Sequence, residues 1–145
     1  MHNELIVKKG MRVIVQGATG KEGQRAIAFM QNYGMRVIAG VTPGKGGQIV
    51  EDIPVFNSVQ DALQRVGPAD AASIYVPAVA AISAIKEAVR ARIPLVHMLT
   101  EAIPYKDLAY MKELCKNNGI HLLGPGSLGI LVVGEGRIGM LGGLK

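Results

Sequence analysis

The fold is decided by residues 12–23, RVIVQGATGKEG, in which a short apolar run leads directly into glycines spaced G-x-x-G-x-x-G. The run Arg12–Gln16 is rich in β-branched residues and predicts a strand. Apolar residues recur at helical spacing after Gly23, so the glycines fall where a strand turns into a helix. They permit a tight turn and leave the N–H groups of the helix start open to a phosphate. The alternative interpretation is a tight turn that binds nothing.

Strands and helices continue to alternate along the chain. The further expected strands are Arg36–Val41, a short one near Val55, Ser73–Val76, Leu95–Leu99 and His121–Leu123. The expected helices are Glu22–Tyr33, Ser58–Val66, Ala78–Ala91 and Pro104–Asn118, and a short strand pair is expected around Ile130–Val133 and Arg137–Met140. No strand alternates cleanly between apolar and polar residues, which is typical of parallel strands covered on both faces. The sequence predicts one α/β domain, a Rossmann-like doubly wound parallel sheet of about five strands with helices on both faces. Its ligand should bind at the carboxyl ends of the strands.

Composition narrows the class of protein. The 145 residues can bury a substantial core. Every uncharged stretch is shorter than the about 18 to 20 residues of a membrane span, and the first residues do not resemble a secretory signal. We therefore expect no membrane association. An aromatic content of 4% without tryptophan argues against base stacking, and hence against a nucleic-acid partner.

The reactive side chains are few. The single cysteine, Cys115, excludes an internal disulfide and lies on the apolar face of an expected helix, where it should pack in the core. His2, His97 and His121 have no zinc-ligand spacing, and we expect them to be structural or solvent-facing. A reducing cytoplasm is the expected location. The net charge of +5 favours an anionic partner, and a phosphate-bearing ligand is the first expectation.

The loop after the second strand, GVTPGKGG at 40–47, indicates which nucleotide is bound. An NAD-binding unit carries an Asp or Glu about 20 residues beyond the glycine turn to hold the ribose hydroxyls. No acid occurs here between Glu22 and Glu51, and Lys45 lies on this loop instead. A lysine suits a phosphate on the ribose, as in NADP or coenzyme A (CoA). The other interpretation is a solvated loop lysine, so all three possibilities stay open.

Six blocks, in order and at matching spacing, resemble the N-terminal CoA-binding domain of the succinyl-CoA synthetase (succinate–CoA ligase) α-subunit family. They are QGATGKEGQ at 16–24, GVTPGKGG at 40–47, PVFNSVQDAL at 54–63, IYVPA at 74–78, LTEAIP at 99–104 and LLGPGSLG at 122–129. The resemblance spans essentially residues 1–145 and implies coenzyme A as the cofactor.

The resemblance also implies a set of CoA-binding residues that runs from the phosphates to the pantetheine arm. Thr19, Gly20, Lys21 and Glu22 wrap the phosphates, Pro43 and Lys45 hold the adenosine end, Tyr75, Val76 and Pro77 line the cleft, and Leu99, Thr100 and Glu101 contact the pantetheine arm. We expect no metal ion, because the three histidines have no spacing that suits zinc.

Two departures from the family bear on catalysis. The family continues into a second domain with a phosphorylated histidine, for which residues 1–145 offer no counterpart, so we assign no catalytic residue. The family's Gly-Pro-Asn-Cys-Pro-Gly turn is Gly-Pro-Gly-Ser-Leu-Gly at 124–129.

We therefore expect a CoA-binding component of an acid–CoA ligase (NDP-forming) that is inactive by itself. A phosphohistidine-domain chain and a nucleotide-grasp β-type subunit would complete it. The alternatives are a stand-alone CoA-binding module without catalysis and an NADP-binding oxidoreductase domain.

Overall fold

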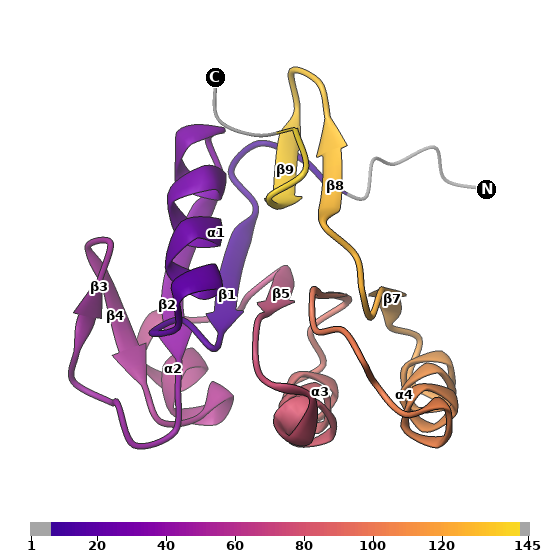
Figure 1. Ribbon diagram of the computed structural model, residues 1–145. Helices are drawn as coiled ribbons and strands as arrows, with labels where there is room; N and C mark the ends of the chain where they lie inside the picture. The colour runs from indigo at the N-terminus through magenta and orange to yellow at the C-terminus, as the bar shows by residue number, and fades with distance from the viewer. Residues whose placement is uncertain (1–6, 143–145) are drawn as a thin grey trace.

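The computed structural model describes residues 7–142, and within them a seven-stranded sheet forms the centre (Figure 1). Its strands are β1 (Arg12–Gln16), β2 (Arg36–Val41), β3 (Ile49–Val50), β4 (Ile53–Phe56), β5 (Ala71–Ile74), β6 (Leu95–Met98) and β7 (His121–Leu123). The spatial order is β3-β4-β2-β1-β5-β6-β7, and every neighbouring pair is parallel except β3 with β4. Without β3, this is the 3-2-1-4-5-6 order of doubly wound dinucleotide-binding folds. The predicted Rossmann-like class is confirmed. The short strand expected near Val55 is β4, and of the seven described strands in this sheet only β3 was not expected.

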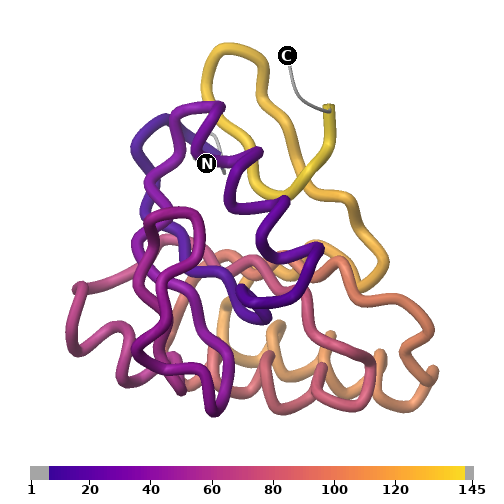
Figure 2. The backbone as a smooth tube through the Cα atoms, turned by 60° about the vertical axis from the view of Figure 1, so that its left-hand side comes forward, coloured from indigo at the N-terminus to yellow at the C-terminus, as the bar shows by residue number. Residues whose placement is uncertain are grey.

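Helices cover both faces of the sheet, as predicted. They are α1 (Lys21–Asn32), α2 (Val59–Val66), α3 (Ala81–Arg90) and α4 (Tyr105–Asn117), with the short 3₁₀ helix η1 (Ala78–Ala80) before α3. Figures 1 and 2 show α2, α3 and α4 on one face and α1 on the other, beside a separate hairpin of β8 (Gly129–Val132) and β9 (Gly136–Gly139). None of the helices between residues 7 and 142 is long and apolar enough to cross a membrane.

Two expected elements differ from the structure by more than one residue at a boundary. The strand expected at Ser73–Val76 lies at Ala71–Ile74. Its neighbour β1 ends at Gln16, opposite Ile74, so β1 offers Val76 no strand partner. The helix expected from Ala78 begins with a 3₁₀ turn and becomes α-helical at Ala81.

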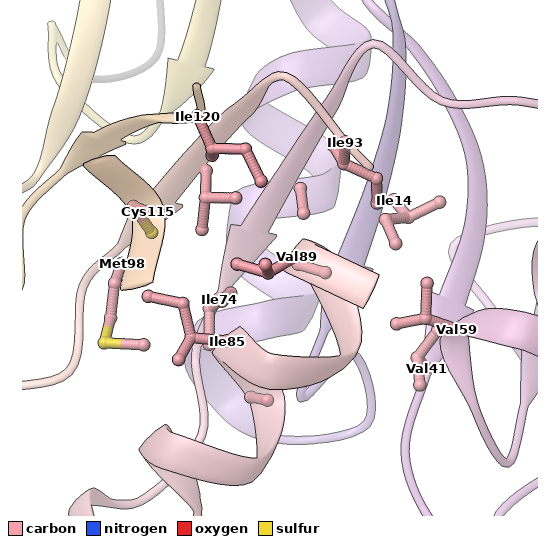
Figure 3. Packing of buried hydrophobic residues seen from close by; sticks show 14 of the residues in the cluster. Ile14, Val41, Val59, Ile74, Ile85, Val89, Ile93, Met98, Cys115 and Ile120 are labelled. Carbon is pink, nitrogen blue, oxygen red and sulfur yellow. The ribbon is translucent and has the colours of Figure 1, made fainter. Parts of the chain in front are cut away.

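Alternate residues of the strands pack in two hydrophobic layers, one on each face of the sheet. Val13 and Val15 pack in the layer of α1, whereas Ile14, between them, packs in the layer of α2, α3 and α4. Figure 3 shows part of this second layer, which also holds Cys115 with 1% of its surface exposed. The core position predicted for this cysteine is confirmed. Because each strand is apolar on both faces, its continuous apolar sequence follows directly from the architecture.

Arg137 of β9 fastens the hairpin to α1. Its guanidinium donates to the carbonyl oxygens of Phe29 at 2.9 Å and Leu141 at 3.2 Å, although only 2% of the residue is exposed. It also lies 5.0 Å from the ring centroid of Phe29 and 5.4 Å from that of Tyr33. The Tyr33 hydroxyl accepts from the N–H of Gly134 in the hairpin turn at 3.0 Å. Polar contacts therefore set the position of the hairpin.

Replacing Arg137 by Met should lower the free energy of unfolding by about 2 to 4 kcal/mol, because two carbonyl acceptors lose their donor in a buried place. Urea unfolding followed by circular dichroism measures the loss. Arg25→Met, on the exposed side of α1, is the matched control and should stay within about 0.5 kcal/mol of the wild type. Equal stability of the two variants would contradict the role given to Arg137.

Candidate functional site

Four loops that hold the predicted CoA-binding residues lie at one edge of the sheet. They follow the carboxyl ends of β2, β1, β5 and β6, which are consecutive neighbours in the sheet. Because these strands are parallel, their carboxyl ends meet at the same edge (Figure 1). The chain adds β2 and β4 on one side of β1 and β5, β6 and β7 on the other, so the strand order reverses between β1 and β5, where doubly wound folds bind their ligands. The fold thus brings all twelve predicted residues to one edge.

The three glycines of the first turn have different structural roles. Gly17 has φ +81°, and a Cβ placed on it would lie 2.8 Å from the carbonyl carbon and oxygen of Tyr75. A Cβ on Gly23 would lie 2.1 Å from the carbonyl oxygen of Gly17. A Cβ on Gly20 would come no nearer than 3.6 Å to another group, which is ordinary contact. Gly17 and Gly23 are therefore needed for packing, whereas Gly20 leaves open space at the start of the helix.

The start of α1 can accept an anion. Gly20 is its N-cap residue, and no side chain caps the helix there. Main-chain N–H groups of the first turn therefore have no partner within the helix, and the helix dipole adds a partial positive charge. Lys21 is exposed beside them, while Glu22 is half-buried and pairs with Arg25 at 3.7 Å.

Thr19 connects the glycine turn to the loop after β2. Its hydroxyl donates to the hydroxyl of Thr42 at 3.2 Å, and its N–H donates to the same oxygen at 3.4 Å. The carbonyl of Thr19 accepts from the Gln24 side chain at 2.9 Å. These bonds hold the first two loops of the edge together.

Asn57 shapes the loop that carries Lys45, and the sequence analysis did not assign it this role. Its side-chain Oδ1 accepts from the N–H groups of Gly44 at 3.0 Å and Gly46 at 2.9 Å. Pro43 and Lys45 are exposed on the loop that results. The available signal was the polar residue that directly follows the expected strand near Val55, since β4 pairs with β2.

A second hydrogen-bonded link joins the loops after β5 and β6. The Thr100 hydroxyl donates to the carbonyl oxygen of Val76 at 2.7 Å, and Thr100 is only 8% exposed. Pro77 and Glu101 on either side are exposed, while Leu99 is half-buried. The Thr100 side chain thus acts within the protein, and its exposed neighbours are free to meet a ligand.

Tyr75 and His97 lie under this edge. The Tyr75 hydroxyl and the Ser73 hydroxyl are 2.6 Å apart, and Ser73 Oγ lies 2.8 Å from Nδ1 of His97. Burial raises the pKa of Tyr75 well above its usual value, opposed by the Ser73 hydrogen bond and reinforced by the charge of Glu22. Burial lowers the pKa of His97, against a hydrogen bond to the main chain of Ser127. Both groups are therefore neutral near pH 7, and the buried structural position expected for His97 is confirmed.

One large hollow on the surface lies away from the start of α1. A hollow of about 920 Å³ lies beside β3, β4 and the end of α2, and adjoins the Lys45 loop only through Gly46 and Gly47. None of the residues at the start of α1 lines it, so we do not take it as the site. Among residues 7–142, no three His, Cys, Asp or Glu side chains are grouped so that they could hold a metal ion.

The different roles of the glycines predict different costs for an added methyl group. Gly23→Ala should lower the free energy of unfolding by more than about 2 kcal/mol, because the new Cβ overlaps the carbonyl of Gly17. Gly20→Ala, the matched control, should cost less than about 1 kcal/mol. Chemical unfolding of both variants checks this, and a greater loss for Gly20→Ala would contradict the assignment.

Comparison with known proteins shows the family. The family model of the CoA binding domain matches residues 8–102, a range that contains every predicted site residue. The α subunit of succinate–CoA ligase (ADP-forming) from Aquifex aeolicus is 45% identical over 141 residues, which is 96% of this chain and 46% of that protein. The same subunit from Staphylococcus aureus is 40% identical over 139 residues, with equal coverage. The chain thus spans about half the length of these relatives.

The solved structures support the fold. The ATP citrate lyase of Methanothrix soehngenii, solved in complex with citrate and coenzyme A, superposes with a TM-score of 0.81 at 18% identity, over 96% of this chain and 24% of that one. Since the family model covers well over half of the residues and includes all four loops of the edge, the chain belongs to the CoA binding domain family.

Proposed function

We propose that this domain binds CoA along the carboxyl edge of β2, β1, β5 and β6 and serves as the CoA-binding part of an NDP-forming acid–CoA ligase. The observation that carries the proposal is the convergence of four loops, each bearing residues of the family motifs, on the edge where doubly wound folds bind ligands. The cofactor would lie across these loops, from its phosphates to its thiol.

The phosphates of CoA would bind at the start of α1. The uncapped N–H groups there suit a phosphate oxygen, and the absence of a side chain at Gly20 lets the phosphate approach the main chain. Thr19 keeps the turn in place through Thr42, and Lys21 adds positive charge. Glu22 would contribute through its main-chain N–H, since its carboxylate pairs with Arg25.

The adenosine end would lie against the loop after β2. Lys45 stands exposed between two glycines whose N–H groups are held by Asn57, so the loop is preformed. An exposed ammonium on a preformed loop can contact the ribose phosphate of CoA without a conformational change. Pro43 offers the adenosine an apolar surface beside it.

The pantetheine arm would pass between the loops after β5 and β6. The hydrogen bond from Thr100 to Val76 fixes the separation of these loops. Val76 and Leu99, both half-buried, and Pro77 supply apolar contacts for the arm. Tyr75 would lie beneath the arm, and Glu101, which is exposed, would lie beside it.

The relatives suggest the reaction that this domain serves. They are named as α subunits of succinate–CoA ligase, and this chain spans 46% of their length. We infer that the domain holds CoA and presents its thiol to an acyl phosphate, releasing phosphate and yielding an acyl-CoA. A phosphohistidine domain and a nucleotide-grasp β-type subunit would supply the phosphoryl group. A cytoplasmic location belongs to the same proposal, consistent with Cys115 as a free, buried thiol.

A stand-alone CoA-binding module is the second candidate. The turn at 124–129 favours it, because Ser127 there replaces the cysteine of the family turn and uses its main-chain carbonyl to bond His97. An NADP-dependent oxidoreductase is disfavoured because the Tyr75 hydroxyl is engaged with Ser73 beneath the edge and is not presented to a ligand.

Calorimetric titration of the 145-residue chain tests the proposed cofactor. CoA should bind with a stoichiometry of one, and NADPH should bind far more weakly, because its nicotinamide half has no counterpart to the pantetheine contacts. Tight binding of NADPH with none of CoA would overturn the proposal.

Lys45→Ala should weaken CoA binding by roughly 1.5 to 3 kcal/mol, which is about 10- to 150-fold, if the ammonium contacts the ribose phosphate. The same substitution should leave the affinity for dephospho-CoA, which lacks that phosphate, almost unchanged. Titration of both ligands measures the difference, with Lys112→Ala, exposed on α4, as the matched control. Equal losses for the two ligands would mean that Lys45 does not contact the phosphate.

A further inference from the structure

A chain of buried polar groups runs from the cofactor edge to the turn at 124–129. It consists of the hydroxyls of Tyr75 and Ser73, 2.6 Å apart, the imidazole of His97, 2.8 Å from Ser73, and the carbonyl oxygen of Ser127, 2.7 Å from Nε2 of His97. Ser73 and His97 are fully buried. The rings of Tyr75 and His97 also meet edge to face, with their centroids 5.9 Å apart.

The direction of every proton in this chain follows from its last member. A main-chain carbonyl can only accept, so Nε2 of His97 carries a proton and donates it to Ser127. In the neutral imidazole Nδ1 is then an acceptor, and Ser73 must donate to it. The oxygen of Ser73 in turn accepts from Tyr75. Ser73 thereby selects the tautomer of His97 that can bond Ser127.

The turn at 124–129 is rich in glycine, so hydrogen bonds to neighbouring segments are needed to select one conformation. Gly124, Gly126 and Gly129 all have positive φ, at +110°, +74° and +122°. The turn connects β7 to the hairpin of β8 and β9 (Figure 1). From outside the turn, the side chain of His97 hydrogen-bonds the main-chain carbonyl of Ser127.

The same stretch of chain holds both the turn and the expected cofactor contacts. The N–H of Ser127 donates to the carbonyl oxygen of Met98 at 3.2 Å, and the N–H of Gly126 donates to that of Thr100 at 3.0 Å. The Thr100 hydroxyl itself donates to the carbonyl oxygen of Val76 in the neighbouring loop. A ligand that orders the segment 99–101 therefore also orders the carbonyl oxygen of Thr100, which accepts a hydrogen bond from the turn.

We propose that His97, oriented by Ser73, is a positioning residue that holds the 124–129 turn against the loop after β6, so that binding of CoA at this loop orders the turn. This inference rests on the proposed function, since it requires CoA to contact the segment 99–101. The turn would then form the wall of the site next to the pantetheine arm, and its position would report whether the cofactor is bound. Neither His97 nor Ser73 touches the reacting atoms.

The experiment measures amide hydrogen exchange of Gly126 and Ser127 by NMR, with and without saturating CoA. In the wild type, CoA should slow exchange of both amides by about tenfold, the equivalent of one further stabilised hydrogen bond. In His97→Leu this CoA-dependent slowing should disappear, while the affinity for CoA changes less than about threefold, because the phosphate contacts remain. His121→Leu, at an exposed position on β7, is the matched control and should keep the full slowing.

A second variant and a measurement on the wild type test the inference even if His97→Leu does not fold. Ser73→Ala removes the donor to Nδ1 and leaves the imidazole in place, so the slowing by CoA should be reduced. The nitrogen shifts of His97 in the wild type should show the tautomer with its proton on Nε2, whether or not CoA is present. The tautomer with its proton on Nδ1 would overturn the inference.

Two exchange results and one binding result are decisive. Equal CoA-dependent slowing in the wild type and in His97→Leu would overturn the inference and leave the proposed function intact, as would CoA binding to the wild type without any slowing. A wild type that binds no CoA in the same calorimetric titration would instead refute the proposed function and the inference together.

Discussion

The arrangement of this domain depends on a close approach of main-chain atoms at Gly17. There the chain leaves β1 and passes so near the carbonyl of Tyr75 and the start of α1 that a Cβ on Gly17 or Gly23 would overlap main-chain atoms. This contact sets the start of α1 against the segments that follow β1 and β5. It also aims the first N–H groups of α1 at the edge where the other loops emerge, so the geometry of the expected phosphate site follows from two absent side chains.

The edge is kept in shape by short polar links between neighbouring loops. Thr19 bonds Thr42, Asn57 bonds the main chain around Lys45, and Thr100 bonds Val76. Each link joins loops from two neighbouring strands and leaves adjacent residues exposed. A preformed edge of this kind lowers the ordering cost that a long, flexible ligand such as CoA would otherwise impose.

The hairpin of β8 and β9 adds a second level of organisation. It shares a face of the sheet with α1 and is fixed there by Arg137, while its entry turn is fixed by His97. Burying a guanidinium or an imidazole costs free energy unless the group is hydrogen-bonded. Because these hydrogen bonds form in one arrangement only, they define a single position for the hairpin and its turn. The turn and hairpin are therefore placed by specific polar contacts as well as by apolar packing through Ile138.

The sequence by itself determined the class of fold, because apolar runs and amphipathic segments reflect the strands and helices on which they lie. β1, β2 and β7 have the expected bounds, and the glycine spacing of residues 17–23 placed the first turn correctly. The sequence also contains the family motifs, from which the contacts with CoA are predicted. Only the tertiary structure decided that β5 ends at Ile74, that Asn57 shapes the Lys45 loop and that Ser73, His97 and Ser127 form one chain. Such pairings join residues 11 to 30 positions apart, and they depend on strand order and register, which local periodicity does not encode.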